Sequence, residues 1–151
     1  MHIAQLNIAT LVAPLDSPEL KGFVDLLVEI NDLADNSPGF VWRLQDDSGD
    51  ATSFRPFGPD VIVNLTVWES IEALYAYTYR SDHLGVLQRR REWFRRSGRT
   101  AGRPHLVLWW IDEGERPTAA EAARRLALLE ENGPTWDAFT FRRQFPATLA
   151  A

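Results

Sequence analysis

The sequence contains no cysteine, one lysine and, apart from its first residue, no methionine. Without cysteine the chain has no disulfide framework, no thiolate nucleophile and no cysteine-ligated zinc or iron–sulfur cluster. It also lacks any apolar run of about 18 residues, the length that a membrane-spanning helix requires. The first residues hold no basic segment of the kind that opens a signal peptide. We therefore expect a cytoplasmic protein that does not associate with a membrane.

Several motifs that carry known chemistry are absent as well. There is no Gly-x-Gly-x-x-Gly segment, no Walker-type phosphate loop and no Gly-x-Ser-x-Gly elbow, which disfavours nucleotide-dependent and serine-hydrolase functions. The histidines and acidic residues show no spacing typical of metal ligands, so we expect no metal site.

What is present is the composition of an ordinary globular protein. The 151 residues are 45% hydrophobic and 25% charged, and a chain of this length buries roughly 70% of its unfolded surface. We expect a single domain over residues 1–151, with its core within about 2–145. Six tryptophans are many for a domain of this size.

One local excess of charge stands out. The net charge is −5, yet residues 80–103 carry eight arginines against two acids. Because Trp93 and Phe94 lie among these arginines, nucleic-acid binding is one interpretation. The chain as a whole is acidic, and arginine at the end of a helix is favoured by the helix dipole. We therefore expect a helix end and no nucleic-acid partner.

Hydrophobic periodicity predicts alternating strands and helices. The expected strands are 2–11, 40–45, 61–68 and 105–111. The expected helices are 18–36, with Ser17 as N-cap, then 71–79, 82–96 and 119–132. Ser70 is the expected cap of the second helix, and Thr118 with Glu121 forms a capping box for the last. Alternating phenylalanines at 139, 141 and 145 indicate an edge strand or an arm.

This order, βαββαβ followed by an extra C-terminal helix, predicts an α+β fold of the ferredoxin-like type with an antiparallel sheet. Helices cover only one face of such a sheet. The strands here carry few charged residues on either face, so the other face should also be buried. We expect a second copy of the chain to cover it, with two sheets closing into a dimeric α+β barrel.

Strand parity places four polar side chains on one face of the sheet: Gln5, Asn7, Asn64 and Thr66. This set is too polar for a face that packs against helices. We expect it on the opposite face, where a ligand or water satisfies it. The alternative is a hydrated dimer interior without a ligand.

Two histidines are candidates for chemistry. His83 opens the predicted helix 82–96, and a histidine pKa near 6.5 suits acid–base catalysis or haem ligation. The alternative is a structural His83 that is hydrogen-bonded to Asp82 or to solvent. His105 begins a strand, and we expect it to meet His83 at the mouth of a pocket.

The tryptophans allow two interpretations. Two or three indole walls would suit a flat aromatic ligand, and core packing explains them equally well. The candidates for such walls are Trp42, Trp68, Trp93 and Trp109.

Six segments taken in order resemble the family called domain of unknown function 3291, over about Ile3 to Phe141. They are residues 5–9 (QLNIA), 37–43 (SPGFVWR), 67–70 (VWES), 79–83 (YRSDH), 91–94 (REWF) and 104–110 (PHLVLWW). More distantly, the chain resembles the dimeric α+β-barrel superfamily, which includes antibiotic-biosynthesis monooxygenases, haem-degrading enzymes and small polyketide cyclases.

The resemblance implies a homodimer with a pocket between each sheet and its helices. Members often use a histidine from the helical region after the third strand, which His83 matches. Cofactor-free monooxygenases of the superfamily tend to use a pocket asparagine and tryptophan, for which Asn7 and Trp68 are the matching candidates.

The hypothesis that follows is a homodimeric, cofactor-independent, monooxygenase-like enzyme for a flat aromatic or polyketide-like metabolite. His83 is its expected acid–base residue. The residues expected to bind substrate or steady its charge are Asn7, His105, Gln5, Arg43, Asn64 and Arg80, with the four tryptophans as walls. The alternatives are a haem protein with His83 as axial ligand and Arg43 or Arg80 near the propionates, and a non-catalytic ligand-binding dimer.

Overall fold

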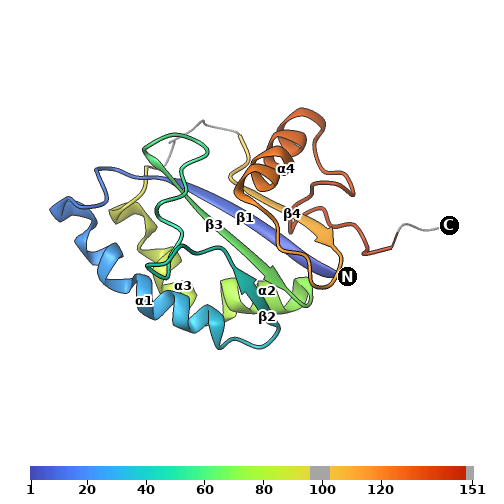
Figure 1. The fold of residues 1–151 in the computed structure, drawn as a ribbon, viewed down its shortest axis with the longest axis horizontal. Coiled ribbons are helices and arrows are strands. Elements are labelled where there is room, and N and C mark those ends of the chain that lie inside the picture. The colour runs from blue at the N-terminus through green and yellow to red at the C-terminus, as the bar shows by residue number, and fades with distance from the viewer. Residues whose placement is uncertain (96–102, 149–151) are drawn as a thin grey trace.

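The computed structural model describes residues 1–95 and 103–148, which fold around a four-stranded antiparallel sheet (Figure 1). Its strands are β1 (His2–Thr10), β2 (Phe40–Arg43), β3 (Val61–Trp68) and β4 (Leu106–Ile111). They lie in the order β2-β3-β1-β4. The sequence predicted all four strands. β3 has the predicted bounds, and the other three are shorter by one or two residues.

Within the described residues, four α-helices and two 3-10 turns accompany the sheet. The helices are α1 (Lys21–Asp35), α2 (Ile71–Arg80), α3 (His83–Gln88) and α4 (Ala119–Asn132). The 3-10 turns are η1 (Pro18–Leu20), directly before α1, and η2 (Arg90–Glu92), shortly after α3.

Two of the predicted helix caps are confirmed, and one is wrong. The Ser70 hydroxyl accepts the N–H of Ala73 at 3.1 Å, and the Thr118 hydroxyl accepts that of Glu121 at 3.1 Å. The hydroxyl of Ser17 instead donates to the carbonyl of Pro14 at 2.5 Å and caps nothing. The chain enters α1 through the turn η1, so the α-helix begins at Lys21.

The predicted helix 82–96 is much shorter than expected, because strand-like pairing replaces its second half. Phe94 forms a β-bridge with Leu11, and the carbonyl of Trp93 accepts the N–H of Val12 at 3.0 Å. The rings of Trp93 and Phe94 pack against Phe23 of α1, with centroids 5.7 and 5.1 Å away. This burial is not available on a straight helix. Arg96, the expected last residue, lies outside the described residues.

The two faces of the sheet are covered by different parts of the same chain. One face, with Gln5, Thr66 and Leu108, lies under α1, α2 and α3. The other, with Leu6, Leu65 and Trp109, is buried against α4 and the connection 46–60. Figure 1 shows α4 lying over β1 and β4. Within α4 the buried residues are Ala122, Leu126 and Leu129.

This arrangement corrects two expectations. The sheet face that we assigned to a second subunit is covered by α4 and the connection 46–60. The polar set with Gln5 and Asn64 was expected on that face and lies on the α1–α3 side. Parity grouped the residues correctly, but it cannot say which group meets which helices, and the extra helix was available for the apolar group.

The C-terminal tail forms an arm along the outer edge of β4. Phe139 makes a single antiparallel bridge with Leu108 and is fully buried. The indole of Trp110 donates to the carbonyl of Phe145 at 2.9 Å and ties down the next part of the arm.

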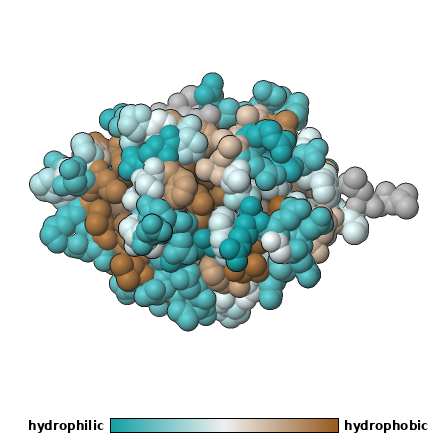
Figure 2. Space-filling view, in the orientation of Figure 1, coloured by the Kyte–Doolittle hydropathy of each residue, from teal (hydrophilic) through white to brown (hydrophobic). Residues whose placement is uncertain are grey.

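The face seen in Figure 2 is mostly hydrophilic, with hydrophobic side chains showing on the side where α1 lies. Val28 and Val24 of α1 are exposed to 72% and 39%. Within the described ranges, no helix is long and apolar enough to cross a membrane.

Candidate functional site

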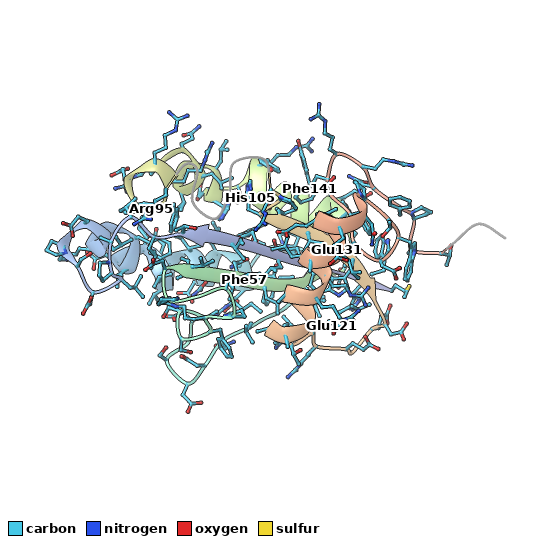
Figure 3. The ribbon with its side chains drawn as sticks, turned by 90° about the horizontal axis from the view of Figure 1, so that it is seen from above. Phe57, Arg95, His105, Glu121, Glu131 and Phe141 are labelled. Carbon is cyan, nitrogen blue, oxygen red and sulfur yellow. The ribbon has the colours of Figure 1, made fainter. Side chains whose placement is uncertain are left out.

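A cavity of about 430 Å³ lies between the sheet and helices α1, α2 and α3. Its walls are largely apolar side chains such as Phe23, Leu27, Ile62 and Leu74. Figure 3 labels His105, a lining residue directly before β4, and Glu121 in the first turn of α4. The lining includes six of the predicted site residues, namely Gln5, Asn7, Arg43, Asn64, His83 and His105.

The sheet side of the cavity is an amide network centred on Gln5, which is only 3% exposed. Its Nε2 donates to Asn64 Oδ1 at 2.7 Å and to Thr66 Oγ1 at 2.9 Å. Its Oε1 accepts Asn7 Nδ2 at 3.2 Å. Thr66 Oγ1 also accepts the indole N–H of Trp68 at 2.9 Å. The network fixes four polar side chains in one orientation. Gln5 and Thr66 are buried with their hydrogen bonds made, whereas Asn7 is half-buried and Asn64 is exposed.

These four side chains, Gln5, Asn7, Asn64 and Thr66, form the amide floor of the cavity. The same bonds determine which hydrogen-bond donors and acceptors of this floor are free for a ligand. With two bonds accepted, Thr66 Oγ1 has its own O–H left to donate. Neither Asn64 Nδ2 nor Asn7 Oδ1 has a hydrogen-bond partner among the described residues, and both side chains line the cavity. The floor therefore presents an amide donor, a hydroxyl donor and an amide acceptor.

His83 lies on the helical side of the cavity and is held by backbone contacts. Its Nδ1 lies 3.2 Å from the carbonyl oxygen of Thr78, so this nitrogen carries the proton and donates. Its main-chain N–H donates to Ser81 Oγ at 3.1 Å. Burial lowers the pKa of His83 below its usual value, more than the bond to Thr78 raises it. The ring is therefore neutral at pH 7, with Nε2 as a hydrogen-bond acceptor.

Tyr77 of α2 also lines the cavity, and the sequence analysis missed it. Its ring stacks between Trp68 and His83, with centroid distances of 5.0 and 4.8 Å. Burial, and secondarily the charge of Asp35, raises the pKa of its hydroxyl, which stays protonated. The available signal was helical spacing, because Tyr77 follows the inward residue Leu74 by three positions.

Arg43 lines the cavity but is engaged by the protein. Its Nε and Nη2 donate to the two carboxylate oxygens of Asp35 at 2.8 and 3.3 Å. Its Nη1 donates to the carbonyl of Gly49 at 2.6 Å. The side chain thus joins α1, β2 and the connection 46–60, and its charge is neutralised by Asp35.

The structure separates the expected tryptophan walls. Trp42 and Trp109 belong to the core on the opposite face of the sheet. Trp93 is buried against α1. Trp68 reaches the site only through its contacts with Thr66 and Tyr77. None of these four rings is among the residues that line the cavity.

Arg80 is also outside the cavity. It is exposed at the end of α2, and its guanidinium lies over the ring of Tyr75 at 5.5 Å. The cavity lining also includes Asp50 and Arg90, two charged residues to which the sequence analysis gave no role in a site.

Comparison with known proteins identifies the family of this chain. The model of the Domain of unknown function (DUF3291) matches residues 2–151. The chain belongs to this family. No curated protein matches the chain in sequence.

Two solved structures are similar to this DUF3291 protein at low sequence identity. A conserved protein from Methanosarcina mazei Go1 is 14% identical, with 74% of this chain and 94% of that chain covered and a TM-score of 0.50. A protein of unknown function from Nitrosomonas europaea, NE2512, is 12% identical, with 78% and 96% covered and a TM-score of 0.48. Neither likeness indicates an activity.

Proposed function

We propose that this DUF3291 protein binds a flat, largely apolar metabolite in the cavity and acts on it as a cofactor-independent, monooxygenase-like enzyme. The observation that carries the proposal is the pairing of His83 with the amide floor across an apolar cavity of about 430 Å³. A neutral imidazole with a free Nε2 is a base, and hydrogen-bond donors opposite it suit an oxyanion.

The proposed chemistry starts with proton removal. His83 Nε2 takes a proton from a phenol or enol of the ligand, and Asn64 Nδ2 and the Thr66 hydroxyl donate to the oxygen anion that forms. The electron-rich anion then reacts with dioxygen. A ring CH2 group and O2 give a ring C=O and one water, so atoms and electrons balance without a bound cofactor.

The topology supports placement in the dimeric α+β-barrel superfamily. The strand order β2-β3-β1-β4 is that of a ferredoxin-like βαββαβ unit, and the cavity lies between sheet and helices, where the resemblance locates a pocket. A homodimer remains part of the proposal. Since α4 covers the second sheet face, the proposed partner subunit contacts a different surface. Light scattering tests the homodimer by measuring the molecular mass in solution.

The decisive experiment compares the wild type with His83→Ala. Flat hydroxyaryl ketones are first screened for binding by calorimetry, and binders are then tested for oxygen consumption. We expect turnover to fall by about 10²–10⁴-fold in His83→Ala, the usual contribution of general acid–base catalysis. Turnover within about threefold of the wild type would contradict this role for His83. Binding of a ketone without any turnover would identify a non-catalytic binding protein.

Haem binding is the second candidate, favoured by one observation. A histidine that donates Nδ1–H to a backbone carbonyl and keeps Nε2 free has the arrangement of a metal-bound histidine. The cations expected near the propionates do not fit, because Arg43 is engaged by Asp35 and Arg80 lies outside the cavity. Titration with haem distinguishes a haem-binding protein from the cofactor-independent enzyme. A shifted Soret band that is lost in His83→Ala would support haem binding through His83.

A further inference from the structure

We propose that the ligand of the cavity carries a carboxylate, which Arg90 binds at the edge of the site. This inference rests on the proposed small-molecule function and names the charge of the molecule that the cavity takes. It assigns a role to part of the arginine-rich segment, which the catalytic proposal leaves unused.

Arg90 is a cavity-lining cation whose charge is not neutralised. It begins η2, is exposed to solvent and uses Nη1 to donate to the carbonyl of Leu87 at 2.8 Å. In the described parts of the chain, no carboxylate lies within ion-pair distance of it. Residues 96–102, which follow closely in sequence, contain no acid. The second terminal nitrogen of the guanidinium is therefore available to a ligand.

The other charged groups of the lining are occupied. Arg43 is bound by both oxygens of Asp35. The carboxylate of Asp50 turns into its own loop, where Oδ1 accepts the N–H and the hydroxyl of Thr52 at 2.9 and 2.6 Å. His83 is neutral. Among the described lining residues, Arg90 is thus the one arginine without a carboxylate partner.

The surroundings of Arg90 strengthen its attraction for an anion. Arg91 and Arg95 lie within five positions of Arg90 in the chain and are exposed, and neither has an acidic partner within the described residues. Arg89 by contrast pairs with Glu92 at 2.8 Å. In a chain of net charge −5, this local positive field steers an anion to the cavity.

The expected ligand is therefore a flat aromatic or polyketide-like acid. Its apolar body contacts side chains such as Phe23 and Leu87, and its carboxylate accepts from Arg90. A guanidinium and a carboxylate match in plane and in spacing, and the charge-assisted bond is stronger than a bond between neutral groups.

The test uses two probes of the same shape, 2-naphthoate and its neutral amide, 2-naphthamide. Each is titrated by calorimetry into the wild type, Arg90→Gln and Arg91→Gln. The two variants change net charge equally, and Arg91 does not line the cavity, so Arg91→Gln is the matched control. Neither residue belongs to the proposed catalytic groups.

We expect the wild type to bind 2-naphthoate about tenfold more tightly than 2-naphthamide. Arg90→Gln should remove this preference by weakening naphthoate alone, and Arg91→Gln should keep it. Equal binding of both probes by the wild type would overturn the carboxylate inference and leave the cavity function intact. Equal loss in both variants would also overturn it, because the field of the whole segment would then be responsible. Failure of both probes to bind would instead count against the cavity function itself.

Discussion

Two opposing influences on the imidazole ring set the protonation state of His83. Burial disfavours the imidazolium, and the carbonyl of Thr78 favours it by accepting Nδ1–H, with burial the stronger of the two. The ring also stacks on Tyr77, whose hydroxyl stays protonated. One side of the cavity therefore holds a fixed, neutral base, while the amide floor opposite holds fixed donors. Such preorganisation is what general-base and oxyanion chemistry require.

We expect the lowered pKa of His83 to make folding sensitive to acid. In the unfolded chain the group titrates near 6.5, so below that pH the unfolded state takes up a proton that the folded state resists. The stabilisation is present above about pH 6.5 and is lost as pH falls from there through the folded pKa. Urea denaturation from about pH 7.5 to 5 measures it as a decline in the free energy of unfolding.

His83→Gln should show a shallower decline over the same range, because its amide does not titrate. Asn7→Ala is the control: Asn7 lines the same cavity and carries no titratable group, so this variant should keep the wild-type slope. Identical slopes for the wild type and His83→Gln would contradict the lowered pKa.

At the scale of elements, sequence signals worked where the side chain itself makes the decisive contact. Ser70 and Thr118 fix the starts of α2 and α4 by local hydrogen bonds, which a sequence pattern can reveal. The end of α3 is different. The predicted helix stops at Gln88, and after the turn η2 Phe94 pairs with Leu11, more than 80 positions earlier. Local propensity contains no information about that contact.

The junction of β2 and α2 gives a prediction at this scale, centred on Gly39. This residue has φ +82°, and a Cβ added to it would lie 2.5 Å from the Cβ of Ala73 in α2. We expect Gly39→Ala to destabilise the protein by about 2–4 kcal/mol, from backbone strain together with overpacking. Denaturant unfolding measures the change.

Substitutions at two other glycines separate the contribution of backbone strain from that of overpacking. Gly58 has φ +111° with nothing within 4 Å of an added Cβ, so Gly58→Ala reports strain alone, about 1–2 kcal/mol. Gly85 lies inside α3 with open space around it, and Gly85→Ala should stabilise by about 0.5–1 kcal/mol. If Gly39→Ala and Gly58→Ala cost the same, close packing at Ala73 is not the reason for glycine at 39.

For the whole molecule, the sequence predicted the strands and grouped the floor residues Gln5, Asn7 and Asn64 on one face. It did not predict which face received the helices, because α4 and the connection 46–60 compete with a second subunit for the same apolar surface. The error extended to the site. Trp42 and Trp109 were candidates for pocket walls, and their strand positions gave no sign that α4 would cover them.

The same feature leads to a prediction about folding. Because α4 completes the core within one chain, stability should not depend on association. Leu126 of α4 is fully buried in this core, so Leu126→Ala should cost about 2–5 kcal/mol by leaving a cavity. For the wild type and this variant alike, the denaturation midpoint should stay constant over about a hundredfold range of protein concentration.

Leu128→Ala is a control on the same helix, at a residue only partly buried against the core, and its cost should be smaller. A midpoint that rises with protein concentration would mean that a second copy of the chain completes the fold, as in a barrel closed sheet to sheet. A constant midpoint together with a dimer mass from light scattering would mean that folding and dimerisation are separate. In that case α1, with exposed Val24 and Val28, becomes the first surface to mutate.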